Sequence, residues 1–458
     1  MARNITVIGS GYVGTVVAGS MALIGHDVVA VESDPEKLAT LSNGTAPFHE
    51  PGLDRVLADQ LSTNRLRFTD NTADGVDHGE VLFLCVGTPE SADGRPDMTA
   101  LEAVADSIGN VIHKDRILVT KSTVPVGSNA WVRTRVEKTA ASRNLRVRLG
   151  SVANPEFLRV GSALSDYLHP DRIVLGSDTQ DDLDVLIDVY RPIIEQTIPA
   201  REFVRGASSL PGLITTSLAT AETIKYAANS FLATKISFIN EIAQISDRVG
   251  ADIDVVARAL GMDTRISPQF LRAGLGWGGS CFGKDLAALT ATALEHGYDP
   301  SLLRAVSTAN EYQRGEVIRK LQRHLSALRG RRVALLGLSF KPNTDDIRDA
   351  PAIHIAKQLL ALGAVVTAHD PVVHSLPNLP SVIVTKDVFT ATDRADAAVI
   401  ITEWQDYKSL DFERVAASMA GTLVVDGRNC LDPDAVGKAG LRYEGIGRAG
   451  HQYLHRDR

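Results

Sequence analysis

The sequence predicts an α/β protein in which two doubly wound, Rossmann-like domains are joined by a central helical region. In the N-terminal part, short apolar runs alternate with helical segments, and the same alternation begins again at Arg332. Between them, the stretch from Ala221 to Val249 contains neither glycine nor proline, which is typical of one long helix. Strands that alternate with helices indicate parallel sheets, and a chain of 458 residues is too long for one core. We expect three domains, residues 1–205, 206–318 and 319–458.

The composition limits the classes of function. Hydrophobic residues make up 44% of the chain and charged residues 22%, as in ordinary globular proteins. No apolar run approaches the roughly 18 residues that span a bilayer. The strand-like Ile5–Ile8 follows Met1 too closely for a signal peptide, so we expect no membrane association. The net charge of -7 argues against a nucleic-acid partner.

The cysteines favour a reducing compartment. Cys85, Cys281 and Cys430 are widely separated, a pattern that makes neither a disulfide framework nor a zinc site. We therefore expect a cytoplasmic protein without a metal. Cys85 belongs to an apolar strand and is expected in the core.

The first strand is followed by a glycine turn that predicts a dinucleotide site. Gly9 makes the tight turn, Gly11 lets the backbone approach a diphosphate, and Gly14 lets the following helix pack on the strand. Glu32 ends the second strand, where a carboxylate accepts from both ribose hydroxyls and repels a 2′-phosphate, so NAD is expected rather than NADP. The turn also includes two further predicted cofactor contacts, Tyr12 and Val13.

Polar side chains follow the next predicted strands. Thr88 comes after the apolar run Val81–Val86, and Ser122 and Thr123 come after Ile117–Val119. In an open α/β sheet these carboxyl ends border the ligand crevice, so the three hydroxyls are candidates for contacts with the cofactor or a catalytic water. Glu156 stands at a further strand end, where it is either a catalytic acid/base or an ordinary surface acid.

Cys281 is the predicted nucleophile. It follows the glycine-rich stretch Gly274–Gly279 and precedes a helical segment that opens with Lys284 and Asp285. A helix N-terminus and a neighbouring lysine both favour the thiolate. The alternative is a cysteine that fills a gap in the core. We favour the nucleophile, on the argument that packing alone does not require this much glycine.

Lys225 and Asn229 lie four residues apart in the long central helix and share one face. Their neighbours are small or apolar, which indicates a half-buried lysine that can stabilise an oxyanion. A solvated lysine beside a polar neighbour is the alternative.

A second α/β unit begins at Arg332–Gly337 and lacks the glycine turn of the first, so we expect it to bind a different ligand. Lys341, Arg348 and Arg428 lie at its predicted strand ends and can contact a diphosphate, although each alone is equally a solvated charge.

Three motifs carry a resemblance to a known family. They are Gly278–Asp285, with the sequence GGSCFGKD, the helix ETIKYAANSFLATKISFINE from Glu222, and Asn154–Arg159, with the sequence NPEFLR. Over nearly its whole length the chain resembles the UDP-glucose/GDP-mannose dehydrogenase family. The resemblance implies an NAD-binding domain, a central dimerisation region and a nucleotide-sugar-binding domain. It also implies two successive oxidations at the sugar C6, with UDP-glucose as the expected substrate and a homodimer as the expected assembly.

The same resemblance implies roles for individual residues. Cys281 forms a thiohemiacetal and then a thioester, Lys225 and Asn229 stabilise oxyanions, Asp285 with Thr123 holds the water, and Glu156 is the acid/base. Arg348 and Lys284 are expected at the cofactor. Residues expected at the nucleotide sugar, besides Lys225 and Asn229, are Phe157, Leu158, Arg265 from across a subunit interface, Phe270, Gly278, Lys341 and Arg428.

The chain departs from the family's pattern at three positions. Val160 stands where a second glutamate is common, Gly283 where proline is frequent, and Glu32 where aspartate is more usual. Other interpretations remain open at this point: the same chemistry on a UDP-N-acetylhexosamine or GDP-mannose, a hydroxyacid dehydrogenase that uses Lys225 and Asn229 for one oxidation, and a nucleotide-sugar-binding protein without turnover.

Overall fold

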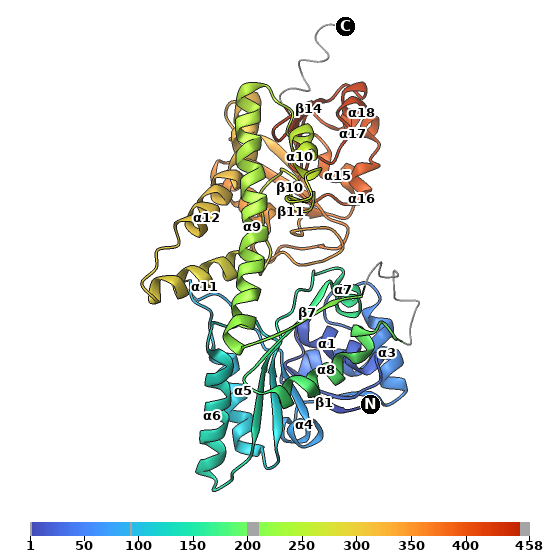
Figure 1. Ribbon diagram of the computed structural model, residues 1–458. Helices are drawn as coiled ribbons and strands as arrows, with labels where there is room; N and C mark the ends of the chain where they lie inside the picture. Colours follow the sequence, from blue (N-terminus) through green and yellow to red (C-terminus); the bar gives the residue numbers. More distant parts are fainter. Residues whose placement is uncertain (1, 92–93, 199–209, 449–458) are drawn as a thin grey trace. The chain divides into compact units, whose positions relative to one another are not determined.

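The computed structural model describes residues 2–91, 94–198 and 210–448 (Figure 1). The chain divides into two compact units, Met1–Ala228 with Ala287–Gly297 and Asn229–Leu286 with Tyr298–Arg458. Each unit contains one sheet, and a helical region lies between the two sheets in the sequence. The predicted α/β class with two Rossmann-like domains is confirmed.

The sheet of the first unit has the order β3-β2-β1-β4-β5-β6-β7-β8. Its strands pair in parallel except for β6 and β7. The central strands are apolar and buried on both faces, as helices on either side of a parallel sheet require. The strands are β1 (Asn4–Ile8), β2 (Asp27–Val31), β3 (Leu66–Thr69), β4 (Val81–Leu84), β5 (Arg116–Thr120), β6 (Leu149–Ala153), β7 (Arg172–Ser177) and β8 (Gly212–Thr216).

Helices cover both faces of this sheet and form two separate cores. Side-chain caps begin several of them: Asp34 accepts from Glu36 and Lys37, and Asn71 accepts from Ala73 and Asp74. The helices are α1 (Tyr12–Leu23), α2 (Pro35–Ser42), α3 (Leu53–Ser62), α4 (Thr72–His78), α5 (Thr99–Val111), α6 (Ser128–Ser142), α7 (Ala163–Leu168) and α8 (Gln180–Ile194).

The sheet of the second unit is parallel throughout, with the order β11-β10-β9-β12-β13-β14. It repeats the order of the first six strands of the other sheet. Asp370 follows β10, as Glu32 follows β2, and accepts hydrogen bonds from the backbone of Leu338 and Ser339 in the turn after β9. The strands are β9 (Arg332–Leu336), β10 (Val365–His369), β11 (Ile383–Thr385), β12 (Ala397–Ile400), β13 (Leu423–Asp426) and β14 (Arg442–Gly445).

The central helix α9 (Leu218–Val249) has 32 residues, begins three residues before the predicted start and contributes to both units. Helix α11, which carries Asp285, also contributes to both. The remaining helices are α10 (Ile253–Gly261), α11 (Phe282–Glu295), α12 (Ser301–Arg314), α13 (Glu316–Leu325), α14 (Pro351–Ala361), α15 (Val388–Thr392), α16 (Gln405–Lys408), α17 (Phe412–Ser418) and α18 (Pro433–Lys438). No helix among the described residues is both long and apolar enough to cross a membrane.

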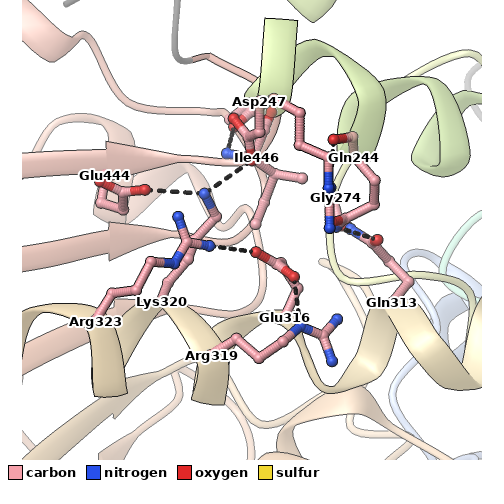
Figure 2. Close-up of polar contacts among 12 residues, drawn as sticks. Gln244, Asp247, Gly274, Gln313, Glu316, Arg319, Lys320, Arg323, Glu444 and Ile446 are labelled. Atoms are coloured by element: carbon pink, nitrogen blue, oxygen red, sulfur yellow. Dashed lines mark hydrogen bonds and ion pairs between the residues drawn. The ribbon is translucent and has the colours of Figure 1, made fainter. Parts of the chain in front are cut away.

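A buried ion network joins α9, α13 and β14 within the second unit (Figure 2). The Lys320 ammonium, only 1% exposed, donates to Asp247 at 3.0 Å and to Glu444 at 2.9 Å. His324 contacts the other oxygen of Glu444 at 3.1 Å. A buried charge is tolerated only when it is paired, so Lys320 requires both carboxylates. Because Asp247 belongs to α9 and Glu444 to β14, the two ion pairs fix the C-terminal sheet to the second half of α9.

Candidate active site

The glycine turn of the first unit has the geometry that a dinucleotide needs. Gly9 has a φ of +91°, and a Cβ on Gly14 would stand 1.8 Å from the carbonyl oxygen of Gly9. By contrast, a Cβ on Gly11 would meet nothing within 4 Å, so space is open beside its backbone. Helix α1 begins at the next residue, Tyr12, and directs its N-terminus at this space.

Glu32 is 7% exposed and lies beside the turn. One carboxylate oxygen accepts from the Ser10 backbone at 3.1 Å and the other from the Asp34 backbone at 2.9 Å. Each oxygen retains a lone pair that can accept from a ribose hydroxyl. The residues present therefore fit NAD at the glycine turn.

Tyr12 and Val13 lie at the start of α1 and are partly buried against the core of the first unit. The Tyr12 hydroxyl bonds to the Glu50 carboxylate and accepts from the Gly161 backbone at 2.9 Å. Glu50, which the sequence reasoning missed, also accepts from Gly161 at 2.7 Å. These bonds tie the dinucleotide turn to the loop that contains Val160. Glu50 thus places a carboxylate beside this loop although Val160 itself is apolar.

The hydroxyls predicted at the ends of β4 and β5 bind neighbouring backbone. Thr88 donates to the Thr123 carbonyl at 2.7 Å, and Ser122 donates to the Val86 carbonyl at 2.6 Å. Their hydroxyl oxygens remain acceptors. A small cavity lies at this end of the sheet; its lining consists of Thr120, Ser122, Thr123, Val124, Asn129, Ala153, Pro155, Glu222 and Lys225.

Lys225 and Glu156 form a buried ion pair. The ammonium donates to Glu156 at 2.9 Å, and the two side chains are 5% and 9% exposed. Lys225 is therefore fully rather than half buried, and the alternatives of a solvated lysine and a surface glutamate are wrong. Burial by itself would raise the pKa of Glu156, but the charge and hydrogen bond of Lys225, the Leu158 N–H and the Lys121 charge together lower it.

Phe157 and Leu158 follow Glu156 and are half buried. The Leu158 N–H donates to Glu156 at 2.6 Å. Two cations lie near the Phe157 ring, whose centroid is 3.7 Å from the Arg172 guanidinium and 5.5 Å from the Lys225 ammonium. The structure thus groups the glutamate, the lysine and two predicted substrate contacts.

Lys121, a second buried lysine, was not singled out from the sequence. It is 5% exposed and donates to Asn154 at 3.0 Å and to Tyr190 at 3.3 Å, both neutral groups. The rings of Tyr167 and Tyr190 lie 5.4 and 5.7 Å from its ammonium. Burial lowers the pKa of Lys121 to about 8. The sequence signal that could have identified Lys121 is its position directly after an apolar strand, where a lysine is expected to be buried.

Glu222 precedes Lys225 by one helical turn and is 4% exposed. Its carboxylate accepts from the Gly127 backbone at 2.7 Å and from the backbone and side chain of Asn129 at 3.0 and 2.7 Å. It therefore caps the N-terminus of α6 and fixes the start of α9 to the first unit.

Cys281 directly precedes α11 and is exposed, as expected for a nucleophile at a helix N-terminus. Its sulfur lies 3.7 Å from the Ser280 hydroxyl. Burial raises the pKa of the Cys85 and Cys430 thiols to about 12 each. Cys85 is buried as predicted, and Cys281 does not fill a gap in the core.

Asp285 is 1% exposed and is held on both oxygens. Asn229 donates to one at 2.6 Å and Lys284 donates to the other at 2.7 Å. The Asp285 N–H donates to the Cys281 carbonyl at 2.9 Å, which closes the first turn of α11. The second unit therefore brings Asn229, Asp285 and Lys284 together directly after the cysteine.

The glycines before Cys281 are required by packing, which corrects the argument that they are not. An added Cβ would stand 2.8 Å from the Gly427 carbonyl at Gly274 and 2.4 Å from the Asp349 carbonyl at Gly278. At Gly276 and Gly279 the φ values are +87° and +86°. Glycine content alone was therefore no reason to favour a nucleophile.

The three cations predicted at strand ends of the second α/β unit differ in their surroundings; Lys341 and Arg428 are expected at the nucleotide sugar and Arg348 at the cofactor. Arg428 is 17% exposed and donates to the carbonyls of Ile401 at 2.6 Å and Phe340 at 3.2 Å. Arg348 is paired with Asp346, and this hydrogen bond, with a smaller contribution from Cys281, raises the pKa of Arg348. Lys341 is half buried, and its ammonium lies 5.5 Å from the Phe340 ring.

Two further predicted substrate contacts lie in the loop after α10. Arg265 is 86% exposed and paired with Asp263. The Phe270 ring lies 6.3 Å from that of Phe282. Gly283, the other departure in this unit, is in the first turn of α11, where a Cβ would make only ordinary contact with Trp277 at 3.5 Å.

The fold and the dinucleotide turn place the chain among the NAD-dependent dehydrogenases. Three family models match consecutive parts of it: residues 3–194 match the NAD-binding domain, 219–312 the central domain and 334–433 the UDP-binding domain. The chain belongs to the UDP-glucose/GDP-mannose dehydrogenase family.

Similar proteins align over nearly the whole chain. A UDP-glucose 6-dehydrogenase of Rhizobium meliloti is 42% identical and covers 97% of this chain and 99% of its own. One of Pseudomonas aeruginosa is 41% identical, with 98% of both chains covered. Among solved structures, a UDP-glucose dehydrogenase of Pyrobaculum islandicum has a TM-score of 0.87 at 36% identity over 98% of both chains. A UDP-D-ManNAc dehydrogenase of Pyrococcus horikoshii has a TM-score of 0.83 at 26% identity, with 97% of this chain and 99% of that one covered.

Proposed function

We propose that the protein oxidises UDP-glucose to UDP-glucuronate in the cytoplasm, using two NAD per substrate. The observation that carries the proposal is Cys281, an exposed cysteine that directly precedes α11. The relatives at about 40% identity are named UDP-glucose 6-dehydrogenases, which favours UDP-glucose over an N-acetylhexosamine or GDP-mannose nucleotide.

The thiol explains how one site performs two oxidations. NAD, when bound, supplies the electron acceptor for each oxidation by taking a hydride. The first oxidation gives a C6 aldehyde, and attack by the Cys281 sulfur then gives a thiohemiacetal. Oxidation of the thiohemiacetal leaves a thioester on Cys281. Water adds to the thioester, and the thiolate leaves as the acid is released.

Protons and charges are handled by the surrounding side chains. Lys225 and Asn229 stabilise the oxyanions through an ammonium and an amide N–H. Glu156 is held as a carboxylate by Lys225, so it is ready to accept a proton from the attacking water. In this proposal Asp285 and Thr123 position that water.

The other assignments follow the family resemblance. The domain limits are 1–205 for NAD, 206–318 for dimerisation and 319–458 for the nucleotide sugar. The proposed cofactor contacts are Gly9, Gly11, Tyr12, Val13, Gly14, Glu32, Thr88, Ser122, Thr123, Lys284 and Arg348. The proposed substrate contacts, besides Lys225 and Asn229, are Phe157, Leu158, Arg265, Phe270, Gly278, Lys341 and Arg428.

The proposed assembly is a homodimer formed through α9. Phe231, Phe238 and Ile245 recur every seven residues along the helix and are 65%, 49% and 51% exposed. A second copy of this helix covers such a stripe well, since a spacing of seven residues suits helix pairing. Phe238→Asp is expected to give a monomer in analytical ultracentrifugation, whereas a dimer with unchanged dissociation constant would refute the assignment.

Replacement of Cys281 by alanine tests the chemistry. The purified enzyme should form close to two NADH per UDP-glucose, and Cys281→Ala should lose overall turnover severely. Cys430→Ala controls for the loss of a cysteine outside the proposed site. One NADH per UDP-glucose, with Cys281→Ala unaffected, would instead support a hydroxyacid-type dehydrogenase that uses Lys225 and Asn229 for a single oxidation.

The substrate is identified by following NADH absorbance with UDP-glucose, UDP-N-acetylglucosamine and GDP-mannose in turn. The proposal predicts the highest kcat/KM for UDP-glucose. Tight binding of a nucleotide sugar without NADH formation would indicate a binding protein.

A further inference from the structure

Helix α9 carries a buried polar stripe on its inner side. Ser237, Asn240 and Gln244 follow each other at intervals of three and four residues and are 3%, 1% and 8% exposed. Buried polar groups are costly unless they are hydrogen-bonded, so their partners indicate what the stripe holds. Those partners are the backbone and the indole of the segment Gly274–Trp277, which leads to Cys281, together with residues of α12.

The first clamp holds Gly274 on both of its backbone groups. Its N–H donates to Asn240 at 2.8 Å, and its carbonyl accepts from Gln313 of α12 at 2.6 Å. Gln244 in turn donates to Gln313 at 2.9 Å, which fixes the orientation of that amide (Figure 2). Gln313 is 1% exposed, so water does not replace this bond.

The second clamp holds Trp277 in the same way. Asn310, 2% exposed, accepts from the Trp277 N–H at 2.8 Å and donates to its carbonyl at 3.1 Å. One side-chain amide thus makes both hydrogen bonds that the backbone of an adjacent β-strand would make with Trp277. The Cβ that an alanine at Gly276 would add stands 2.4 Å from the Asn310 oxygen, so the clamp also demands glycine there.

Trp277 connects the clamps to the residue after the cysteine. Its indole N–H donates to Ser237 at 3.0 Å. Its ring meets Phe282 edge to face, with centroids 6.4 Å apart. Phe282 is the first residue of α11 and directly follows Cys281. The segments before and after Cys281 are therefore both fixed, while the cysteine itself remains exposed.

We propose that Asn310 and Gln313 are positioning residues that hold the Cys281 thiol at the N-terminus of α11. The inference rests on the proposed function, in which Cys281 is the nucleophile. Each amide acts on the thiol through the backbone of Gly274–Trp277. A displacement of about 1 Å in a reacting group reduces a rate by about a hundredfold, so loosening either clamp should affect chemistry more than cofactor binding.

The test compares Asn310→Ala and Gln313→Met with wild type and with Thr367→Val. Thr367 is a matched control because its buried hydroxyl donates to the Ala391 carbonyl at 2.7 Å, next to the C-terminal sheet and away from the segment Gly274–Trp277. Alkylation of the Cys281 peptide by iodoacetamide is followed by mass spectrometry as a function of pH. The kcat for UDP-glucose and the KM for NAD are measured on the same samples.

Both clamp variants should lower kcat about tenfold or more and leave the KM for NAD within about twofold. The midpoint of the alkylation profile should move upward, because a loosened loop loses the favourable end of α11. Thr367→Val should change neither. If Asn310→Ala does not fold, Gln313→Met decides the question alone, because it retains the volume of the side chain.

Unchanged kcat and alkylation in a folded clamp variant would overturn the proposal, as would an equal change in Thr367→Val. Failure of the proposed function gives a different result. In that case Cys281→Ala retains turnover, and the alkylation profiles still report whether the clamps hold the thiol.

Discussion

Lys121→Met is predicted to alter the pH dependence of stability, because Lys121 is a buried cation whose hydrogen-bond partners among the described residues, Asn154 and Tyr190, are neutral. Its ammonium contacts Asn154, Tyr190 and two tyrosine rings. Burial lowers its pKa from 10.5 to about 8. At about 1.4 kcal/mol per pH unit, this interval corresponds to about 3 kcal/mol of lost folding free energy at pH 7.

The direction in which stability changes with pH follows from the number of protons that the folded and unfolded states bind. Below pH 8 the lysine is protonated in both the folded and the unfolded protein, and the folded state bears the full cost of the buried charge. Between pH 8 and 10.5 the Lys121 amine binds more protons in the unfolded state than in the folded state, so the contribution of Lys121 to the free energy of unfolding rises with pH. The Lys121→Met variant has no buried ammonium and therefore lacks this pH-dependent contribution. It also loses the two hydrogen bonds of Lys121, which offsets the gain in stability by about 1–2 kcal/mol. Asn154 retains its hydrogen bond from Tyr190 at 2.6 Å.

At pH 7 the variant should therefore be more stable than the wild type by about 1–2 kcal/mol. Urea denaturation at pH 7 and pH 9.5 measures the difference between the two proteins, in which the titration of other groups cancels. The advantage of the variant should fall by about 2 kcal/mol over this range. Tyr190→Phe, which keeps the cation, should retain the pH dependence of the wild type.

A stability difference that does not change between pH 7 and 9.5 would refute the reasoning. It would mean that the ammonium is as well stabilised in the folded protein as in water. A variant less stable than the wild type at pH 7, with the predicted slope intact, would show instead that the two hydrogen bonds contribute more than the estimate.

Three further predictions concern the cofactor turn, the ion network and the glycine loop. Glu32→Gln should raise the KM for NAD about tenfold in steady-state assays, because ribose hydroxyls bond more strongly to a charged acceptor; an unchanged KM would place the ribose elsewhere. Lys320→Met should lower the free energy of unfolding by about 3 kcal/mol in guanidinium, because Asp247 loses its ion pair in a largely buried position while Glu444 keeps its contact with His324; a loss below about 1 kcal/mol would contradict this. Gly276→Ala should lower the melting temperature more than Gly297→Ala; both glycines have positive φ, but only at Gly276 does the Cβ meet a neighbour, so equal effects would exclude the Asn310 contact as the cause.

Much of the fold was accessible from local sequence. The glycine turn from Gly9 to Gly14 and the carboxylate at Glu32 lie at short, fixed spacings, and the structure places them as predicted. The long helix α9 followed from the absence of glycine and proline. Cys281 was correctly placed before α11, because an apolar periodic segment begins directly after it. In each case the pattern and the structure it predicts occupy the same few residues.

The pairings within the site were not accessible in this way. The sequence presented Glu156 as either catalytic or superficial and Lys225 as half buried, whereas the structure pairs them at 2.9 Å across 69 residues of chain. The sequence did not predict a role for Lys121, Glu222 or Asn310, because their roles depend on burial and on hydrogen-bond partners in other elements. No local pattern shows that packing requires the glycines of Gly274–Gly279, whereas in the structure atoms of distant segments occupy the space that a Cβ would need.

The sequence by itself thus determined the two Rossmann-like domains, the dinucleotide turn and the position of the cysteine at a helix N-terminus. These features depend on backbone conformation and on the burial of apolar side chains, which periodicity records over a few residues. Only the tertiary structure decided which polar groups are paired and which glycines are required. Hydrogen bonds and steric contacts act over a few ångströms between segments that are far apart in the chain, and a local sequence pattern does not show which distant segments lie close together in space.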